Sequence, residues 1–192
     1  MPKVSEEHWR AQEQRFRDAA CRCFTRIGVA PASMEEIRME AGVSAGAMYR
    51  YFPSKDALVH AAIETSMKEV EAILGEVGER GDAATPAEFL GSVLKALRDF
   101  RYHTQGVDLF RLAIQGWAHA QSRPETKAML MASFQRQIAA YADAAARWTS
   151  KTNAETVAAA LGGAVAGYVV QSAFSDEDID PKRYCKGFSG FS

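Results

Sequence analysis

Apolar residues recur at intervals of three and four along almost the whole chain, the spacing of one face of an α-helix. In residues 8–27 the apolar positions are Phe16, Ala19, Ala20, Cys23, Phe24 and Ile27. Gly28 follows them and is a typical helix stop. No segment shows the Val/Ile/Thr-rich alternation of a strand. The pattern therefore predicts an all-α protein with about nine helices.

Short helices follow the first one. Ser33 and Glu36 have the spacing of a capping box, which opens a helix through Ile37 to Glu40. Residues 41–43, Ala-Gly-Val, form a predicted tight turn, and Ser44 is a second N-cap. The next helix runs from about Ser44 to Phe52. These two short helices joined by a Gly-containing turn are typical of a DNA-binding helix-turn-helix.

Longer helices are predicted downstream. Ser54 caps a long helix through residue 74, and the polar stretch 78–84 is a predicted linker. Four further helices are predicted to start downstream. Thr85 and Pro86 begin the first in a second capping box, and Pro124 begins the next. Asn153 is the predicted N-cap of a helix from Ala154, and Asp180 with Pro181 begins the last.

The helix from Ser44 to Phe52 has the side chains that a major-groove helix needs. Ala45, Gly46 and Ala47 are small enough for close approach to a groove about 12 Å wide. Donors to the flanking phosphates are available on Ser44, Tyr49, Tyr51 and Lys55, and Arg50 adds a long cation. By spacing alone, an ordinary helical hairpin with its aromatic residues in a core is an equal alternative.

The particular string shifts that balance. Residues 33–37, SMEEI, and residues 41–61, AGVSAGAMYRYFPSKDALVHA, resemble the DNA-binding domain of the TetR/AcrR family of bacterial repressors, over roughly residues 10–65. The resemblance implies an all-α fold with a three-helix helix-turn-helix DNA-binding domain at residues 1–53. Residues 54–192 then hold the connecting helix and a helical effector-binding and dimerisation domain. The implied partners are a palindromic double-stranded DNA operator, a small-molecule effector and a second copy of the chain.

The resemblance also implies roles for single residues. Those that fall where the family meets DNA are Ser33, Ser44, Ala45, Gly46, Ala47, Tyr49, Arg50, Tyr51 and Lys55. Ala47 departs from the pattern, because Thr or Ser is frequent there. Neither Ala45 nor Ala47 can form a bidentate hydrogen bond to a base, so base-specific recognition depends mainly on Arg50 and on DNA shape.

The C-terminal part carries candidates for the effector and for the dimer. The effector candidates are His103, Phe110, Gln115, Trp117, Phe134 and Tyr141. Pockets combine apolar walls with a few polar groups, but ordinary core packing is an alternative for each aromatic residue. The dimer candidates that the resemblance favours are Gly162, Gly163, Ala166, Gly167 and Val170. The glycines and Ala166 are small enough for close helix packing. A tightly packed internal helix is the alternative there.

Charge and composition add little. The net charge is −1, and residues 1–60 carry 9 Lys and Arg against 8 Asp and Glu, so the DNA hypothesis depends on the motif. No catalytic motif or metal-ligand spacing occurs, which predicts no enzyme activity, cofactor or metal. The apolar run 157–174 is judged too short and too weakly apolar to span a membrane, so a cytoplasmic protein is expected. A helical ligand-binding or adaptor protein without DNA binding is the alternative function.

Overall fold

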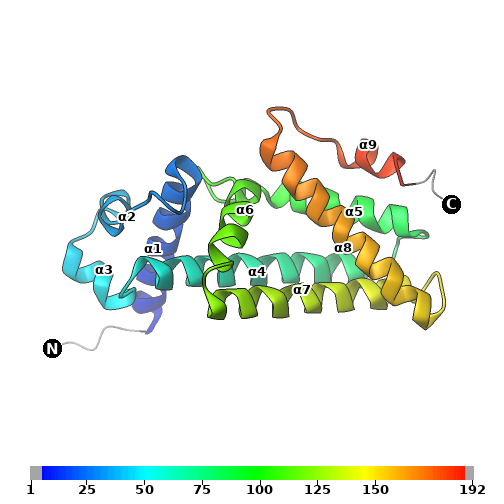
Figure 1. Ribbon diagram of the computed structural model, residues 1–192, viewed down its shortest axis with the longest axis horizontal. Coiled ribbons are helices and arrows are strands. Elements are labelled where there is room, and N and C mark those ends of the chain that lie inside the picture. Colours follow the sequence, from blue (N-terminus) through cyan, green and yellow to red (C-terminus); the bar gives the residue numbers. More distant parts are fainter. Residues whose placement is uncertain (1–5, 189–192) are drawn as a thin grey trace.

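The computed structural model describes residues 6–188, except the side chain of Ala45, and contains nine helices and no strand over that range (Figure 1). The helices are α1 (Glu6–Ile27), α2 (Met34–Ala41), α3 (Ala45–Tyr51), α4 (Lys55–Arg80), α5 (Pro86–Phe100), α6 (Leu109–Ala120), α7 (Pro124–Ala145), α8 (Lys151–Phe174) and α9 (Pro181–Lys186). The all-α prediction is confirmed. Helices α1–α3 form one end of an elongated molecule, and α4 runs from them along the larger bundle (Figure 1).

The N-terminal bundle has its own core. Its buried side chains include Phe16, Phe24, Ile37, Met48 and Leu58, which come from α1, α2, α3 and the first turns of α4. The predicted capping box is present, with Ser33 Oγ accepting from the Glu36 nitrogen at 3.1 Å. Gly42 ends α2 with φ +64°, a left-handed conformation that favours glycine. These local signals set the angle between α2 and α3.

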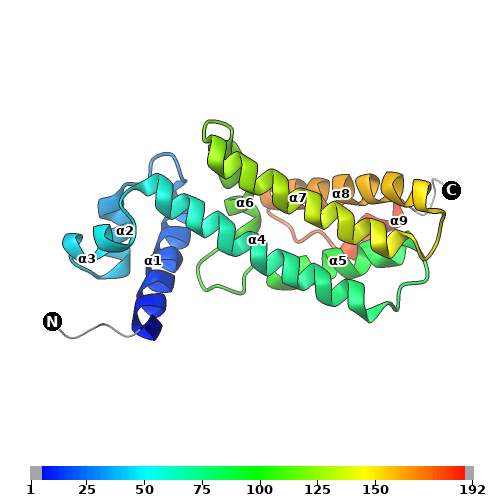
Figure 2. The ribbon, with the colours of Figure 1, turned by 90° about the horizontal axis from the view of Figure 1, so that it is seen from below.

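The C-terminal bundle consists of α4–α9. Helix α7 packs along both α4 and α8, while α5 contacts α4, α8 and α9 (Figure 2). The largest side chains of its core, Tyr141 and Tyr168, are almost completely inaccessible to solvent. Helix α6 is short and lies between the two bundles, in contact with α1 on one side and with α7 and α8 on the other. This position makes α6 a physical connection between the two cores.

Two predicted boundaries and one predicted capping box need correction. Helix α4 continues through Gly78 to Arg80 and ends at Gly81, with φ +62°, so the linker is shorter than predicted. Helix α8 begins at Lys151 with Ser150 at the N-cap, one turn before Asn153. At Thr85 only half of the capping box forms, because Glu88 accepts from the Ala84 nitrogen instead.

Helix α8 is more apolar than expected. It has 24 residues and reaches a mean hydropathy of 1.5 over an 18-residue stretch, so by length and composition it could cross a membrane. The prediction that this segment is too short and too weakly apolar is therefore wrong. Core helices of folded proteins can be equally long and apolar, so these properties alone do not indicate a membrane span. In this chain only 39% of the 18-residue stretch is buried. Much of the apolar surface of α8 is left uncovered.

Candidate nucleic-acid interface and ligand cavity

Helix α3 presents one face to the core and the other to solvent. Met48 is buried, and so is Phe52 directly after the helix. Ser44, Gly46 and Arg50 are exposed, and Tyr49 is 52% exposed. In an ordinary hairpin with its aromatic residues in the core, the side chain of Tyr49 would be buried, so its exposure argues against that alternative. Of the residues predicted on this helix to contact DNA, Ser44, Gly46, Tyr49 and Arg50 are thus exposed, whereas Ala47 and Tyr51 are partly buried. The side chain of Ala45 lies outside the described residues.

Trp9 supports this face, although the sequence analysis did not single it out. Its ring stacks on Tyr51 with centroids 3.9 Å apart, and the Arg50 guanidinium carbon lies 5.4 Å from the Trp9 centroid. Tyr51 also makes an edge contact with Phe16 at 5.1 Å. Tyr51 is thus half-buried between two rings, and Arg50 is held beside a cation–π partner. A lone aromatic residue near the start of α1 gave no periodic signal for this role.

Two predicted phosphate contacts have partners within the chain. The Ser33 hydroxyl donates to Glu36 Oε2 at 2.8 Å. Lys55 Nζ donates to the backbone oxygens of Val29 and Ala30 at 3.1 and 2.9 Å. An ammonium group has three protons, so these bonds leave one for a phosphate. Lys55 therefore ties the start of α4 to the loop after α1 and keeps a proton for another acceptor.

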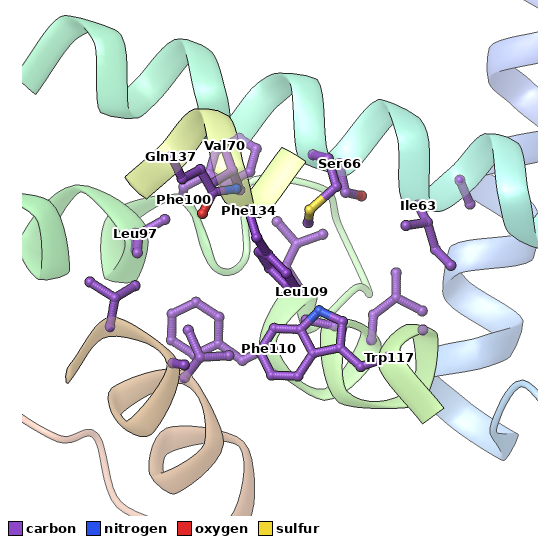
Figure 3. Close-up of a pocket in the computed structure, with 18 of the residues that line it drawn as sticks. Ile63, Ser66, Val70, Leu97, Phe100, Leu109, Phe110, Trp117, Phe134 and Gln137 are labelled. Atoms are coloured by element: carbon purple, nitrogen blue, oxygen red, sulfur yellow. The ribbon is translucent and has the colours of Figure 1, made fainter. Parts of the chain in front are cut away.

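A cavity of about 340 Å³ lies inside the larger bundle (Figure 3). Helices α4, α5, α6, α7 and α8 supply most of its wall. Figure 3 shows Ser66 and Gln137 on one side of it and Phe110 and Trp117 on the other. Phe24 and Val29 of the N-terminal bundle also line it. The cavity therefore borders both cores, and its volume is in the range of small-molecule sites.

Four of the six predicted effector residues line this cavity, namely Phe110, Trp117, Phe134 and Tyr141. His103 lies in the loop before α6, where its ring stacks on Phe100 with centroids 3.9 Å apart. Gln115 instead bonds to the backbone of Phe24 and Val29. The sequence missed Ser66 and Gln137, because a lone polar residue on a helix gives no sign of which face it occupies.

A buried ion pair fixes the start of α6. Arg101 Nε and Nη2 donate to the two carboxylate oxygens of Asp108 at 2.9 and 2.7 Å. Asp108 also caps α6 by accepting from the Phe110 and Arg111 nitrogens. Burial raises the pKa of Asp108, but the Arg101 and backbone hydrogen bonds outweigh it and the pKa is lowered overall. The carboxylate thus stays ionised and holds the helix that lines the cavity.

The predicted dimer residues divide into two groups. A Cβ at Gly162 would overlap Ile138 of α7, and one at Gly167 would lie 3.0 Å from the Tyr184 hydroxyl oxygen. These two glycines serve packing within the chain. Gly163, Ala166 and Val170 are exposed, and Ala166 also lines the cavity. Phe174, which is 76% exposed, extends this apolar face by one turn beyond Val170.

Comparisons with known proteins agree with this architecture. A family model described as bacterial regulatory proteins, tetR family, matches residues 16–62. The HTH-type transcriptional repressor Rv1474c of Mycobacterium tuberculosis is 33% identical over 107 residues, which cover 53% of this chain and only 57% of that relative. The HTH-type transcriptional regulator BetI of Cronobacter sakazakii is 24% identical over 181 residues, covering 94% and 87% of the two chains.

The fold also matches solved structures. A protein from Saccharomonospora viridis, solved in complex with choline, superposes with a TM-score of 0.72 over 95% of each chain at 16% identity. At this identity the likeness concerns the fold alone. It extends over both bundles, whereas the family model covers only the N-terminal one.

Proposed function

Because the chain belongs to the TetR family of bacterial regulatory proteins, we propose that it is a dimeric transcriptional repressor released from DNA by a small molecule. The observation that carries the proposal is the shared wall of the cavity. Phe24, Val29 and Val59 line the cavity and belong to the core of the N-terminal bundle. A molecule in the cavity therefore touches the structure that positions α3.

DNA binding is assigned to the exposed face of α3. Ser44 and Tyr49 present hydroxyl groups for phosphates, and Arg50 is the longest side chain available to base edges. Lys55 adds its remaining proton at the start of α4. Most affinity then comes from phosphate contacts and depends strongly on salt.

Dimerisation is assigned to α8. Gly163, Val170 and Phe174 lie on one exposed side of a helix that is apolar around its circumference. Such a surface is expected to be covered by another apolar surface. A two-fold dimer through this face presents two α3 helices to half-sites of a palindromic operator about one helical turn apart.

Effector release requires that the ligand bind the DNA-competent and released arrangements with different affinity. The cavity provides a basis for that difference, because α1 and the loop after it contribute to its wall together with α4–α8 of the larger bundle. A ligand that alters the spacing of these helices shifts α4 and with it the position of α3. The two α3 helices of the dimer then no longer match the half-sites.

The direct test is fluorescence anisotropy with the promoter of the protein's own gene and a library of genomic fragments, at one fixed salt concentration. A specific fragment is expected to bind, and Tyr49→Ala is expected to weaken that binding at least tenfold. Met131→Ala is the matched control, because Met131 is about as exposed, at 49%, but lies on α7. If no fragment binds specifically, the proposal fails and the ligand-binding adaptor alternative is favoured.

A further inference from the structure

The wall of the cavity is almost entirely apolar. Four of its lining residues have side chains with polar nitrogen or oxygen atoms, namely Ser66, Trp117, Gln137 and Tyr141. No Asp, Glu, Lys, Arg or His of the described chain lines it. Burying an unpaired charge in such surroundings costs several kcal/mol. The cavity is therefore unfavourable for an ion of either sign.

The rings around the cavity do not change this conclusion for a cation. A desolvated cation–π contact contributes about 2 kcal/mol or more, which offsets only part of the several kcal/mol that an unpaired buried charge costs. Phe110 already has the Arg101 guanidinium carbon 5.0 Å from its centroid. The charge of Arg101 is balanced by Asp108, so that pair leaves no negative charge for a ligand cation. The nearby carboxylate of Glu71 is bonded to Ser133 and Arg136.

Two donors on the wall lack hydrogen-bond partners within the described chain. They are the indole nitrogen of Trp117 and the hydroxyl oxygen of Tyr141, and both atoms are buried. Tyr141 is only 2% exposed. An unsatisfied buried polar group costs about 1–3 kcal/mol. An indole N–H only donates, and burial raises the pKa of Tyr141, so its hydroxyl keeps its proton. A ligand with hydrogen-bond acceptors would therefore satisfy both groups.

The two donors lie in different parts of the cavity. Trp117 packs edge-to-face against Phe134, with centroids 5.9 Å apart. Tyr141 follows Phe134 by seven residues on α7, which corresponds to about 10 Å along the helix. Gln137 lies one turn before Tyr141 and faces the same cavity (Figure 3). The polar groups are thus spread along α7 with apolar wall between them.

From these observations we propose that the cavity takes an uncharged, elongated and mainly apolar molecule with acceptor oxygens near its two ends. One oxygen accepts from Trp117 Nε1 and the other from the Tyr141 hydroxyl. A diester, diketone or diether of about this length has the required chemistry. As the identity of an effector, this inference rests on the proposed function; as a statement about binding, it does not.

The test is isothermal titration of the full-length protein with four probes. Dimethyl suberate is neutral and has a carbonyl at each end. Monomethyl suberate is the corresponding half-ester, whose free carboxyl group gives it one negative charge at neutral pH. Hexamethonium is a dication with the same six-methylene spacer, and decane is an uncharged chain without oxygen. Dimethyl suberate is expected to bind at least about tenfold more tightly than either ion, because of the cost of burying charge. It should also bind more tightly than decane, because of its two acceptors.

Two variants test the individual donors. Trp117→Phe and Tyr141→Phe are each expected to weaken dimethyl suberate binding by about three- to tenfold. Neither should lower the melting temperature of the ligand-free protein through a lost hydrogen bond, since neither donor has a partner among the described residues. Trp148→Phe and Tyr168→Phe are matched controls, because these donors bond to Ala83 and Ile179 and do not line the cavity. The controls are expected to lower the melting temperature and leave affinity unchanged.

The outcomes separate this inference from the proposed function. An ion that binds as tightly as the diester, or a diester that does not bind, overturns the ligand class. Unchanged affinity in both donor variants overturns the assigned contacts. If the diester binds as expected but never changes operator affinity, the proposed class of ligand is supported and the proposed release from DNA by an effector is contradicted. If an ion releases the protein from DNA, the proposed function stands and the ligand class fails.

Discussion

The side-chain oxygen of Gln115 accepts a hydrogen bond from the backbone nitrogen of Val29 at 2.6 Å. The amide nitrogen of Gln115 donates to the carbonyl of Phe24 at 3.2 Å. One side chain of α6 therefore holds both the last turn of α1 and the loop after it. Gly28 stands between the two contacts with φ +93°, a conformation unfavourable for other residues. Because Gly116 and Trp117 on the same helix line the cavity, α6 connects the cavity wall directly to the N-terminal bundle.

Replacing Gln115 by Ala is expected to weaken this connection. The free energy of unfolding should fall by about 1–3 kcal/mol, because the Val29 nitrogen loses its partner. The ligand-induced change in operator affinity should also shrink, which anisotropy titrations with and without ligand will measure. Gln121→Ala is the control, since Gln121 is exposed at the end of the same helix. A full ligand response in Gln115→Ala would show that the signal passes elsewhere.

Replacing Lys55 by Met is expected to affect both stability and DNA binding. The two carbonyls of the loop after α1 lose their donor, so the melting temperature should fall. Removing one phosphate contact should also reduce the slope of log affinity against log salt by about 0.9. Lys95→Met is the control, because Lys95 is exposed on α5 and pairs with Asp99. A lower melting temperature with an unchanged slope would assign Lys55 to loop attachment alone.

Replacing Trp9 by Leu is expected to weaken operator binding without unfolding the N-terminal bundle. The Arg50 guanidinium loses the ring at 5.4 Å and becomes less ordered before DNA binding. Tyr51 loses a stacked partner but keeps Phe16. We expect a three- to tenfold loss of affinity, from about 1 kcal/mol of lost cation–π and stacking interaction. Circular dichroism should confirm unchanged helix content, and unchanged affinity would exclude a supporting role for Trp9.

The parts of this architecture that depend on neighbouring residues could be predicted from the sequence. The Ser33 capping box, the Gly42 turn and the Ser54 cap involve residues within a few positions of each other. The predicted start of α8 is wrong because Ser150 and Asn153 are both good N-cap residues, and local propensity does not distinguish between them. Gln115 and Val29 are 86 positions apart, and periodicity does not reveal which helix face meets another bundle.

Acidification is expected to destabilise the protein through His119. Burial lowers the pKa of this imidazole, with Arg123 and Lys55 acting in the same direction and Asp56 opposing them. The native state therefore keeps a neutral ring while the unfolded chain takes up a proton near pH 6.5. Stability should fall as pH decreases below about 6.5, until the native ring also protonates. Urea unfolding between pH 7.5 and 5 should show a shallower decline for His119→Gln than for the wild type.

Two adjacent glycines of α8 offer a matched pair of substitutions. A Cβ at Gly162 would overlap Ile138, whereas a Cβ at Gly163 meets no described atom within 4 Å. Gly162→Ala gains helix propensity, but the displacement of Ile138 should offset much of the stability gained. Gly163→Ala should stabilise the isolated fold by up to about 1 kcal/mol.

The dimer gives these substitutions a second readout. If Gly163 lies in a close α8 contact between copies, Gly163→Ala and above all Gly163→Leu should weaken dimerisation, although a Cβ at this position meets no described atom within 4 Å. Light scattering during size-exclusion chromatography over a dilution series measures the dimer fraction, and thermal unfolding measures the fold. Val170→Asp is expected to give monomers, since it places a charge on the same exposed face. A dimer unaffected by all three substitutions would mean that the copies associate through another surface.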